Sequence, residues 1–184
     1  IIRLWAHQWK MQFNPDPTKQ ANEIIFSCKK SKPIHPRLSF NGSPVAKAEE
    51  QKHLGLTLRP NLCFQKHINE KLTKAKKSIG LIKHLSRYLP LVALNHMYKS
   101  FVRPHLDYCD VIFHEPHKVN QLGQTLTSTM EEIEKVQYKA ALHVTGTWQG
   151  TSRSKFYEEL GWESLSDRRR SRRLQMMHKI VNNC

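Results

Sequence analysis

The sequence contains no run of about 18 apolar residues, so no segment of its 184 residues is predicted to cross a bilayer. Glycine is scarce, at 7 residues, and no glycine loop of the kind that cradles phosphates is present. The 4 cysteines lie far apart without paired spacing, so no disulfide framework is indicated. Free thiols suit a reducing compartment, and we expect an intracellular protein of the cytoplasm, the nucleus or both.

Acidic residues are also few: 15 Asp and Glu face 30 Lys and Arg, giving a net charge of +15. Residues 1–60 hold 10 basic and 4 acidic groups, residues 61–110 hold 9 and 3, and residues 111–184 hold 11 and 8. Such a surplus indicates a polyanionic partner, most commonly nucleic acid. An anionic membrane surface is the alternative, but no predicted helix joins dense basic charge to exposed Trp or Phe, so no membrane partner is expected.

Residues 1–60 predict an α+β arrangement with antiparallel pairing. Apolar residues at positions 4, 5, 9 and 11 indicate the end of an amphipathic helix, stopped by the prolines at 15 and 17. Strands are predicted over 23–27, 37–40 and 53–58, and Asn41-Gly42 signals a tight turn leading into 44–46. The first segment should therefore be a small antiparallel sheet with a hairpin.

Beyond Pro60 the pattern becomes helical. Apolar residues step by 4, 3, 4 and 3 to form one stripe of Ile68, Leu72, Ala75, Ile79 and Ile82. Pro90 is predicted to end this helix and Pro104 the next, which covers 91–102. An exposed loop is predicted over 114–130, then helices over 130–144, 154–160 and 166–181, with Gly146 and Gly161 as stops and Ser166-Asp167 as a cap. The result would be a mainly helical bundle.

Several phrases occur in the order typical of reverse transcriptases from non-LTR (LINE-type) retrotransposons, and the sequence resembles that family over nearly its whole length. They are Phe13–Ala21, Gln51–Gly55, Ile82–Leu85, Tyr98–Tyr108, Glu134–Tyr138, Gly150–Arg153 and Glu159–Arg169.

The resemblance implies a piece of an RNA-directed DNA polymerase. Residues 1–60 would be the end of the palm with a primer-grip-like hairpin, and 61–113 the thumb-like helices. Residues 114–130 would be a loop and 131–184 a helical region after the thumb. RNA template and DNA primer would be the partners, with the upstream palm and fingers of the parent enzyme. The parent would use Mg²⁺ on palm aspartates that precede residue 1, so no cofactor is expected in this chain and the isolated chain should be inactive.

Lys19 matches a family lysine beside the departing pyrophosphate, where an ammonium could stabilise the leaving group. A solvated lysine after a double-proline turn is the alternative. Leu54-Gly55 matches the primer-gripping element, because glycine allows a close backbone approach. An ordinary strand glycine at a bulge would give the same pattern.

Four lysines lie opposite the apolar stripe, and only Glu70 interrupts them: Lys66, Lys71, Lys74 and Lys77. This near-absence of acids favours phosphate contact over a merely solubilising face, which mixes charge signs. A second basic cluster contains Arg168, Arg169, Arg170, Arg172 and Arg173. Of these, Arg168, Arg169, Arg172 and Arg173 are candidate nucleic-acid contacts, although some of the cluster could instead pair with Asp167 or Glu163.

The segment Asp107-Tyr108-Cys109-Asp110 looks like a degraded polymerase acidic pair, but its aspartates are separated by two residues instead of adjacent. It matches instead a family phrase with glycine at the position of Cys109, and a packing role is predicted. A positive φ at that position would strain the cysteine. A zinc site is indicated only weakly by Cys109, His114 and His117, which are loosely spaced and have no fourth ligand. No metal site is therefore predicted. No catalytic residue is predicted in the chain.

Two functions stay open at this level. The first is template–primer binding within a retrotransposon polymerase. The alternative is a non-enzymatic basic nucleic-acid-binding remnant or domesticated module, which requires a stable fold of its own. Strands separated from their sheet partners would expose unpaired edges and oppose that alternative.

Overall fold

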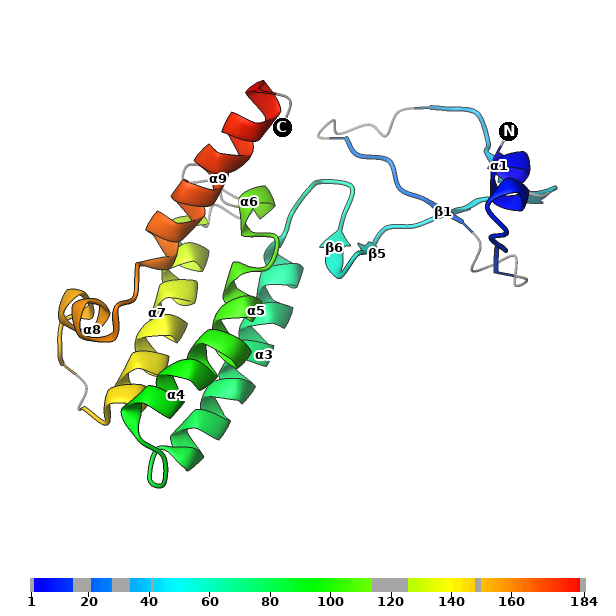
Figure 1. Cartoon of the computed structure of the whole chain (residues 1–184). Coiled ribbons are helices and arrows are strands. Elements are labelled where there is room, and N and C mark those ends of the chain that lie inside the picture. The colour runs from blue at the N-terminus through cyan, green and yellow to red at the C-terminus, as the bar shows by residue number, and fades with distance from the viewer. Residues whose placement is uncertain are drawn as a thin grey trace. The chain divides into compact units, whose positions relative to one another are not determined.

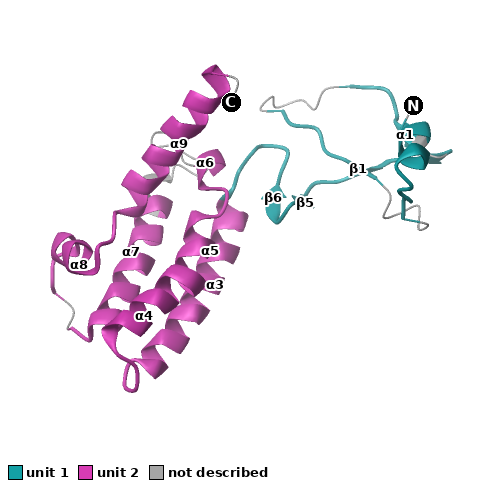
Figure 2. Cartoon of the chain, in the orientation of Figure 1, with its two compact units in different colours: residues 1–64 teal, residues 65–184 magenta. Residues whose placement is uncertain are grey.

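The computed structural model describes residues 2–14, 21–27, 34–40, 42–113, 126–147 and 150–182. The chain divides into two compact units, residues 1–64 and 65–184 (Figure 2). The described residues are mainly helical with small two-stranded sheets, which confirms the predicted α+β class. None of the described helices combines the length and apolar character that a membrane span requires.

The first unit begins with α1 (Ile2–Gln8), which ends before the prolines. Lys10 has a left-handed φ of 52°, so the chain already leaves the helix there and the predicted proline stop is wrong. Six short strands follow: β1 (Asn22–Glu23), β2 (Ser39–Phe40), β3 (Ser43–Pro44), β4 (Ala46–Lys47), β5 (Gln51–His53) and β6 (Leu56–Leu58).

These strands pair two by two. β2 and β3 are antiparallel, and the turn between them includes Gly42 at a φ of 78°. β1 pairs with β4 in parallel, so the expectation of antiparallel pairing throughout is wrong. β1 also ends at Glu23. The strand predicted over 23–27 is therefore too long, since residues 24–27 are in no strand. Asn41 lies outside the described residues.

The predicted strand over 53–58 is instead a hairpin. β5 and β6 pair antiparallel, with His53 opposite Leu56. Leu54 and Gly55 form the two-residue connection at φ values of 47° and 78°. Positive φ at both central residues is the signature of a type I′ turn, whose twist matches that of the flanking strands. Gly55 is therefore a turn residue rather than a strand residue at a bulge.

The first unit buries little of its own apolar surface. Among its described residues, only Ala6, Leu56 and Thr57 are buried. Trp5 and Trp9 are 50% and 64% exposed. Two-stranded sheets of this kind are marginally stable without a hydrophobic face to cover them.

The second unit is a helical bundle built on one long central helix, α3 (Gln65–Leu85) (Figure 1). α3 packs against the helices that follow it, and its predicted apolar stripe is confirmed because all five members are buried. The other helices are α4 (Leu91–Met97), π-helix η1 (Tyr98–Val102), α5 (Arg103–Asp107), α6 (Asp110–Phe113), α7 (Leu126–Thr145), α8 (Arg153–Leu160) and α9 (Leu165–Val181).

Both predicted proline stops in this unit need correction. α3 ends at Leu85, and Pro90 is instead the N-cap of α4. Pro104 lies in the first turn of α5, directly after the π-helix, so the helical path continues past it. A proline lacks the backbone donor that an interior helical position needs, but the first turn does not use that donor. The π-helix η1, whose turn is wider than that of an α-helix, ends directly before this first turn of α5.

The helix ends in the second half agree in part with the sequence patterns. α7 begins at Leu126, so the predicted loop over 114–130 is too long, and residues 114–125 lie outside the described part. Gly146 and Gly161, at φ values of 70° and 62°, end α7 and α8 as predicted. Ser164, not Ser166, caps α9, because its hydroxyl accepts from the Asp167 backbone N–H at 3.0 Å.

Candidate nucleic-acid interface

The exposed side of α3 carries a row of lysines. Lys66, Lys74 and Lys77 are exposed and Lys71 is half-buried, while the opposite face of the same helix is packed in the core. Among the residues that the structure describes, no carboxylate lies within ion-pair distance of Lys74 or Lys77. This side of α3 therefore presents positive charge that no described carboxylate pairs with at those two positions.

Lys71 joins this face to the end of α5. Its Nζ lies 3.9 Å from the centroid of the Tyr108 ring, the geometry of a cation–π contact. The Tyr108 side chain is 38% exposed, so an aromatic edge lies beside the lysine row at the surface. Unpaired bases of nucleic acids stack on exposed aromatic rings next to basic side chains.

Two histidines flank α3 on its neighbouring helices. His105 of α5 is near Lys71 and Lys74, and its pKa is lowered by burial and then by those two ammonium groups. His143 of α7 is near Lys83 and Lys139, and burial followed by these lysines lowers its pKa in the same way. Neither histidine was predicted from the sequence, because neither is on the helix that carries the lysine row.

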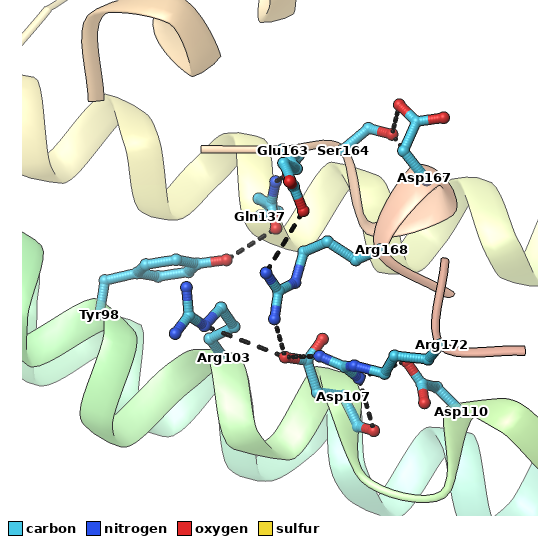
Figure 3. Close-up of polar contacts among 10 residues, drawn as sticks. All are labelled: Tyr98, Arg103, Asp107, Asp110, Gln137, Glu163, Ser164, Asp167, Arg168 and Arg172. Carbon is cyan, nitrogen blue, oxygen red and sulfur yellow. Dashed lines mark hydrogen bonds and ion pairs between the residues drawn. The ribbon is translucent and has the colours of Figure 1, made fainter. Parts of the chain in front are cut away.

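The second predicted cluster, on α9, has a different environment (Figure 3). Arg168 Nη2 lies 3.0 Å from Asp107 Oδ2, and Arg172 Nη1 lies 2.6 Å from Asp110 Oδ2. Arg172 also pairs with Asp107, and Arg103 Nε lies 3.9 Å from the same carboxylate. These contacts fix the first half of α9 to α5 and α6.

This placement corrects the predicted role of the arginines. Arg169 is 1% exposed and lies 3.6 Å from the Glu134 carboxylate, so it cannot contact an external phosphate. Arg168 also lies 3.5 Å from Glu163, as the alternative interpretation anticipated. Arg168 and Arg172 already hold internal carboxylates, and an external phosphate would have to replace them. Arg173 is exposed, and its contact with nucleic acid stays a prediction.

The Asp107–Asp110 segment is held in position by ion pairs with arginines. Cys109 has a φ of 59°, so the backbone position is left-handed and strained for any residue with a Cβ. Asp110 is 2% exposed, and burial raises the pKa of its carboxyl. Two carboxylates held by guanidinium groups do not fit a magnesium site, and no cluster of three His, Cys, Asp or Glu side chains suited to a metal occurs within the described residues. His114 and His117 lie outside the described part.

The remaining predicted sites belong to the first unit. Leu54 and Gly55 lie together at the tip of the β5–β6 hairpin, where Leu54 is 81% exposed. A turn with an exposed tip can approach another chain closely, and the contact of this turn with a primer stays a prediction. Lys19 lies outside the described residues.

A polar network in the core holds the bundle together. The buried Tyr98 hydroxyl donates to Gln137 Oε1 at 2.7 Å, and Gln137 Nε2 donates to the Glu163 carbonyl at 2.9 Å. The Trp162 ring stacks on Tyr98 at a centroid distance of 3.7 Å. An adjoining cavity of about 140 Å³ is lined by Arg103, Arg168 and Glu163 among others. Arg168 pairs with Glu163 and with Asp107, and Arg103 approaches the same Asp107, so the charged groups of the lining are held by ion pairs within the protein.

Comparison with known proteins gives one distant relationship. No family model matches the sequence, and no solved structure matches the chain. The chain is 26% identical over 147 residues to a Drosophila melanogaster protein described as "Probable RNA-directed DNA polymerase from transposon X-element". The match covers 77% of this chain but 14% of that protein. The chain is thus a distant relative of a transposon polymerase and spans a small part of its length.

Proposed function

We propose that this chain is the part of a retrotransposon RNA-directed DNA polymerase that holds the template–primer duplex. The observation that carries the proposal is the lysine face of α3, where Lys74 and Lys77 have no carboxylate partner among the described residues. The distant relationship to a transposon polymerase supports the choice of nucleic acid as the polyanion.

The dimensions of α3 suit a phosphate backbone. Lys66 to Lys77 span about 16 Å along the helix, at 1.5 Å per residue. Successive phosphates follow about every 3.4 Å along the axis of a strand, so the row can reach several of them. Contacts of this kind position a duplex without reading its sequence. A polymerase needs that property, because it must accept every template it copies.

Catalysis would belong to other parts of the polymerase. The carboxylates of Asp107 and Asp110 hold arginines, and we derive no metal-dependent step from the residues of this chain. In this proposal the isolated chain binds a primed template but does not extend the primer. The tip of the β5–β6 hairpin would contribute a backbone contact to the primer end.

Binding can be measured by fluorescence anisotropy with an RNA–DNA hybrid over a range of salt concentrations. We expect Lys74→Gln with Lys77→Gln to lower affinity about tenfold near 0.1 M salt and to reduce the salt slope by about 1.5. The matched control is Lys155→Gln with Lys179→Gln, two exposed lysines on α8 and α9, which should change little. Equal effects of the two pairs would contradict the assignment of the α3 face.

A non-enzymatic nucleic-acid-binding module is the second candidate, because residues 65–184 form a compact unit with a buried core of their own. Calorimetry separates the two. One cooperative melt of the helical unit favours a self-standing module, whereas a broad, non-cooperative melt favours a subdomain that depends on the rest of a polymerase for its fold. Magnesium-dependent primer extension by the isolated chain would overturn both.

A further inference from the structure

We propose that Tyr108 is a stacking platform for an unpaired base of nucleic acid, and that Lys71 binds the phosphate of the same nucleotide. The inference rests on the proposed function and deepens it, because the ligand becomes a duplex that continues into a single strand. It also gives a role to the Asp107–Asp110 segment, whose ion pairs and strained cysteine are not part of the lysine face of α3.

The Tyr108 ring lies beside the lysine face of α3. Tyr108 is the C-cap of α5, and α5 packs against α3. The side chain is 38% exposed, and Lys71 Nζ lies 3.9 Å from the centroid of the ring. The ring and the ammonium group are thus neighbours, and a nucleic acid that contacts the lysines of α3 also reaches the ring.

The backbone that carries Tyr108 is fixed on both sides. Asp107 before it and Asp110 after it both pair with Arg172 of α9. Between these two anchors Cys109 has a left-handed φ of 59°. Backbone strain of this kind persists only where the surrounding structure over-determines it, and such positions cluster at ligand sites. A ring on a fixed turn has little freedom to lose when a base stacks on it, which favours binding.

Rings of the core support Tyr108 from the inside of the bundle. The centroid of the His67 ring lies 6.2 Å from that of Tyr108, and the Phe113 ring lies 5.9 Å from His67. His67 and Phe113 are both buried, at 0% and 4% exposure. Tyr108 therefore rests against the core on one side while part of its surface stays accessible, as a stacking platform requires.

The charges near the ring suit a phosphate. Lys74 follows Lys71 by one turn, and no described carboxylate lies within ion-pair distance of it. The acids on either side of Tyr108 in the sequence are held by arginines of α9. Glu70 is the only acid of α3, and it is half-buried. A nucleotide whose base lies on Tyr108 would bring its phosphate to the two lysines.

The other acids on helices packed against α3 belong to α7. Glu131 pairs with Arg153 at 2.6 Å, and Glu134 lies 3.6 Å from Arg169. Glu132 is exposed, whereas the exposed lysines of α3 are at positions 66, 74, 76 and 77. An incoming strand thus meets more positive than negative charge on these helices.

Binding would exchange one contact of Lys71 for two contacts of the nucleotide. A lysine ammonium is a compact charge on a flexible stem, so it can move from the ring to a phosphate oxygen while the base takes its place. A cation–π contact near the surface is weak, so its loss costs little. Stacking accepts any base, because every base has a π-face. The site therefore fits a protein that must hold templates of every sequence.

Fluorescence anisotropy of the full chain can compare a blunt RNA–DNA hybrid with hybrids that carry a short overhang on the RNA strand or on the DNA strand. We expect an overhang on one of the two strands to tighten binding about tenfold. Tyr108→Leu should remove this difference, and Tyr108→Phe, which keeps the ring, should preserve it. The matched control is Tyr88→Leu, a 73% exposed tyrosine beyond the other end of α3, which should also preserve it.

The outcomes separate the two proposals. If the unaltered chain binds no hybrid, the proposed function fails. If it binds blunt and overhanging hybrids equally, or if Tyr108→Leu keeps the difference, this inference fails and the proposed function stands. Should Tyr108→Leu unfold, 5-iodouracil in the overhang decides the question with the unaltered protein, because on irradiation it crosslinks to a ring on which it stacks. Mass spectrometry should find the crosslink on Tyr108, and crosslinks at other residues alone would refute the inference.

Discussion

Arg172 of α9 lies 2.6 Å from the Asp110 carboxylate of α6 and also pairs with Asp107 at the end of α5 (Figure 3). This contact gives α9 a different role from α3, although both are strongly basic in sequence. The inward arginines of α9 are neutralised by acids from the preceding helices. At Lys74 and Lys77 of α3, by contrast, no described carboxylate lies within ion-pair distance.

Replacing the shared carboxylate should loosen α9. In Asp107→Asn, Arg168 and Arg172 lose a charged acceptor while remaining partly buried, at 22% and 28% exposure. We expect a loss of about 2 kcal/mol in the free energy of unfolding, less than for fully buried pairs because water reaches the arginines. Urea unfolding measures this change in the free energy of unfolding. Glu159→Gln, an exposed change on α8, should stay within about 0.5 kcal/mol, and equal losses would contradict the role of Asp107.

The strained cysteine offers a stabilising substitution. Cys109 has a φ of 59°, and a Cβ is unfavourable in that region by about 1 kcal/mol. Cys109→Gly removes the Cβ but adds freedom to the unfolded chain, so we expect a net gain of about 0.5 kcal/mol. Cys109→Ala keeps the Cβ and should give no gain, while Cys109→Val should lose stability. The melting temperatures of the three variants test the order, and a gain for alanine equal to that for glycine would exclude backbone strain as the cause.

Two phenols should resist alkaline titration: Tyr98, which is buried, and Tyr157, which is half-buried. Burial, as the largest cause, raises the pKa of Tyr98 and of Tyr157 above the usual 10.0. Since the folded-state pKa is the higher one, the stability that these groups contribute is complete below pH 10 and is lost as pH rises through the folded value. Both should ionise only on unfolding, as followed by ultraviolet tyrosinate absorbance.

Two variants assign that delayed absorbance. Tyr98→Phe and Tyr157→Phe should each remove part of it. Immediate ionisation of every tyrosine just above pH 10 in the folded protein would contradict the predicted burial.

The sequence predicts what depends on neighbours within one helix. The stripe from Ile68 to Ile82 follows the 3.6-residue period, so both the buried face of α3 and its lysine face could be predicted. The glycine stops at Gly146 and Gly161 follow from the same local rules.

Contacts between distant segments could not be predicted in this way. Arg168 meets Asp107 across 61 positions, and only the packing of α9 on α5 brings them together. The β5–β6 turn was missed for a local reason: the alternation from His53 to Leu58 fits a continuous strand, and leucine at a positive φ is no turn signal. His105 and His143 needed the bundle, because each is on a different helix from the α3 lysines that act on it.

The two units should differ sharply in resistance to protease. In residues 1–64 the described strands are two or three residues long and only Ala6, Leu56 and Thr57 are buried, so local opening costs little free energy. In residues 65–184 the described helices share a core. Brief trypsin digestion of the full chain should therefore cut among the basic residues of the first unit and leave a helical fragment beginning near Gln65. Mass spectrometry identifies the fragment. The exposed lysines of α3 are possible trypsin sites that the folded bundle should protect. First cuts within α3 would show that the bundle does not fold as a unit.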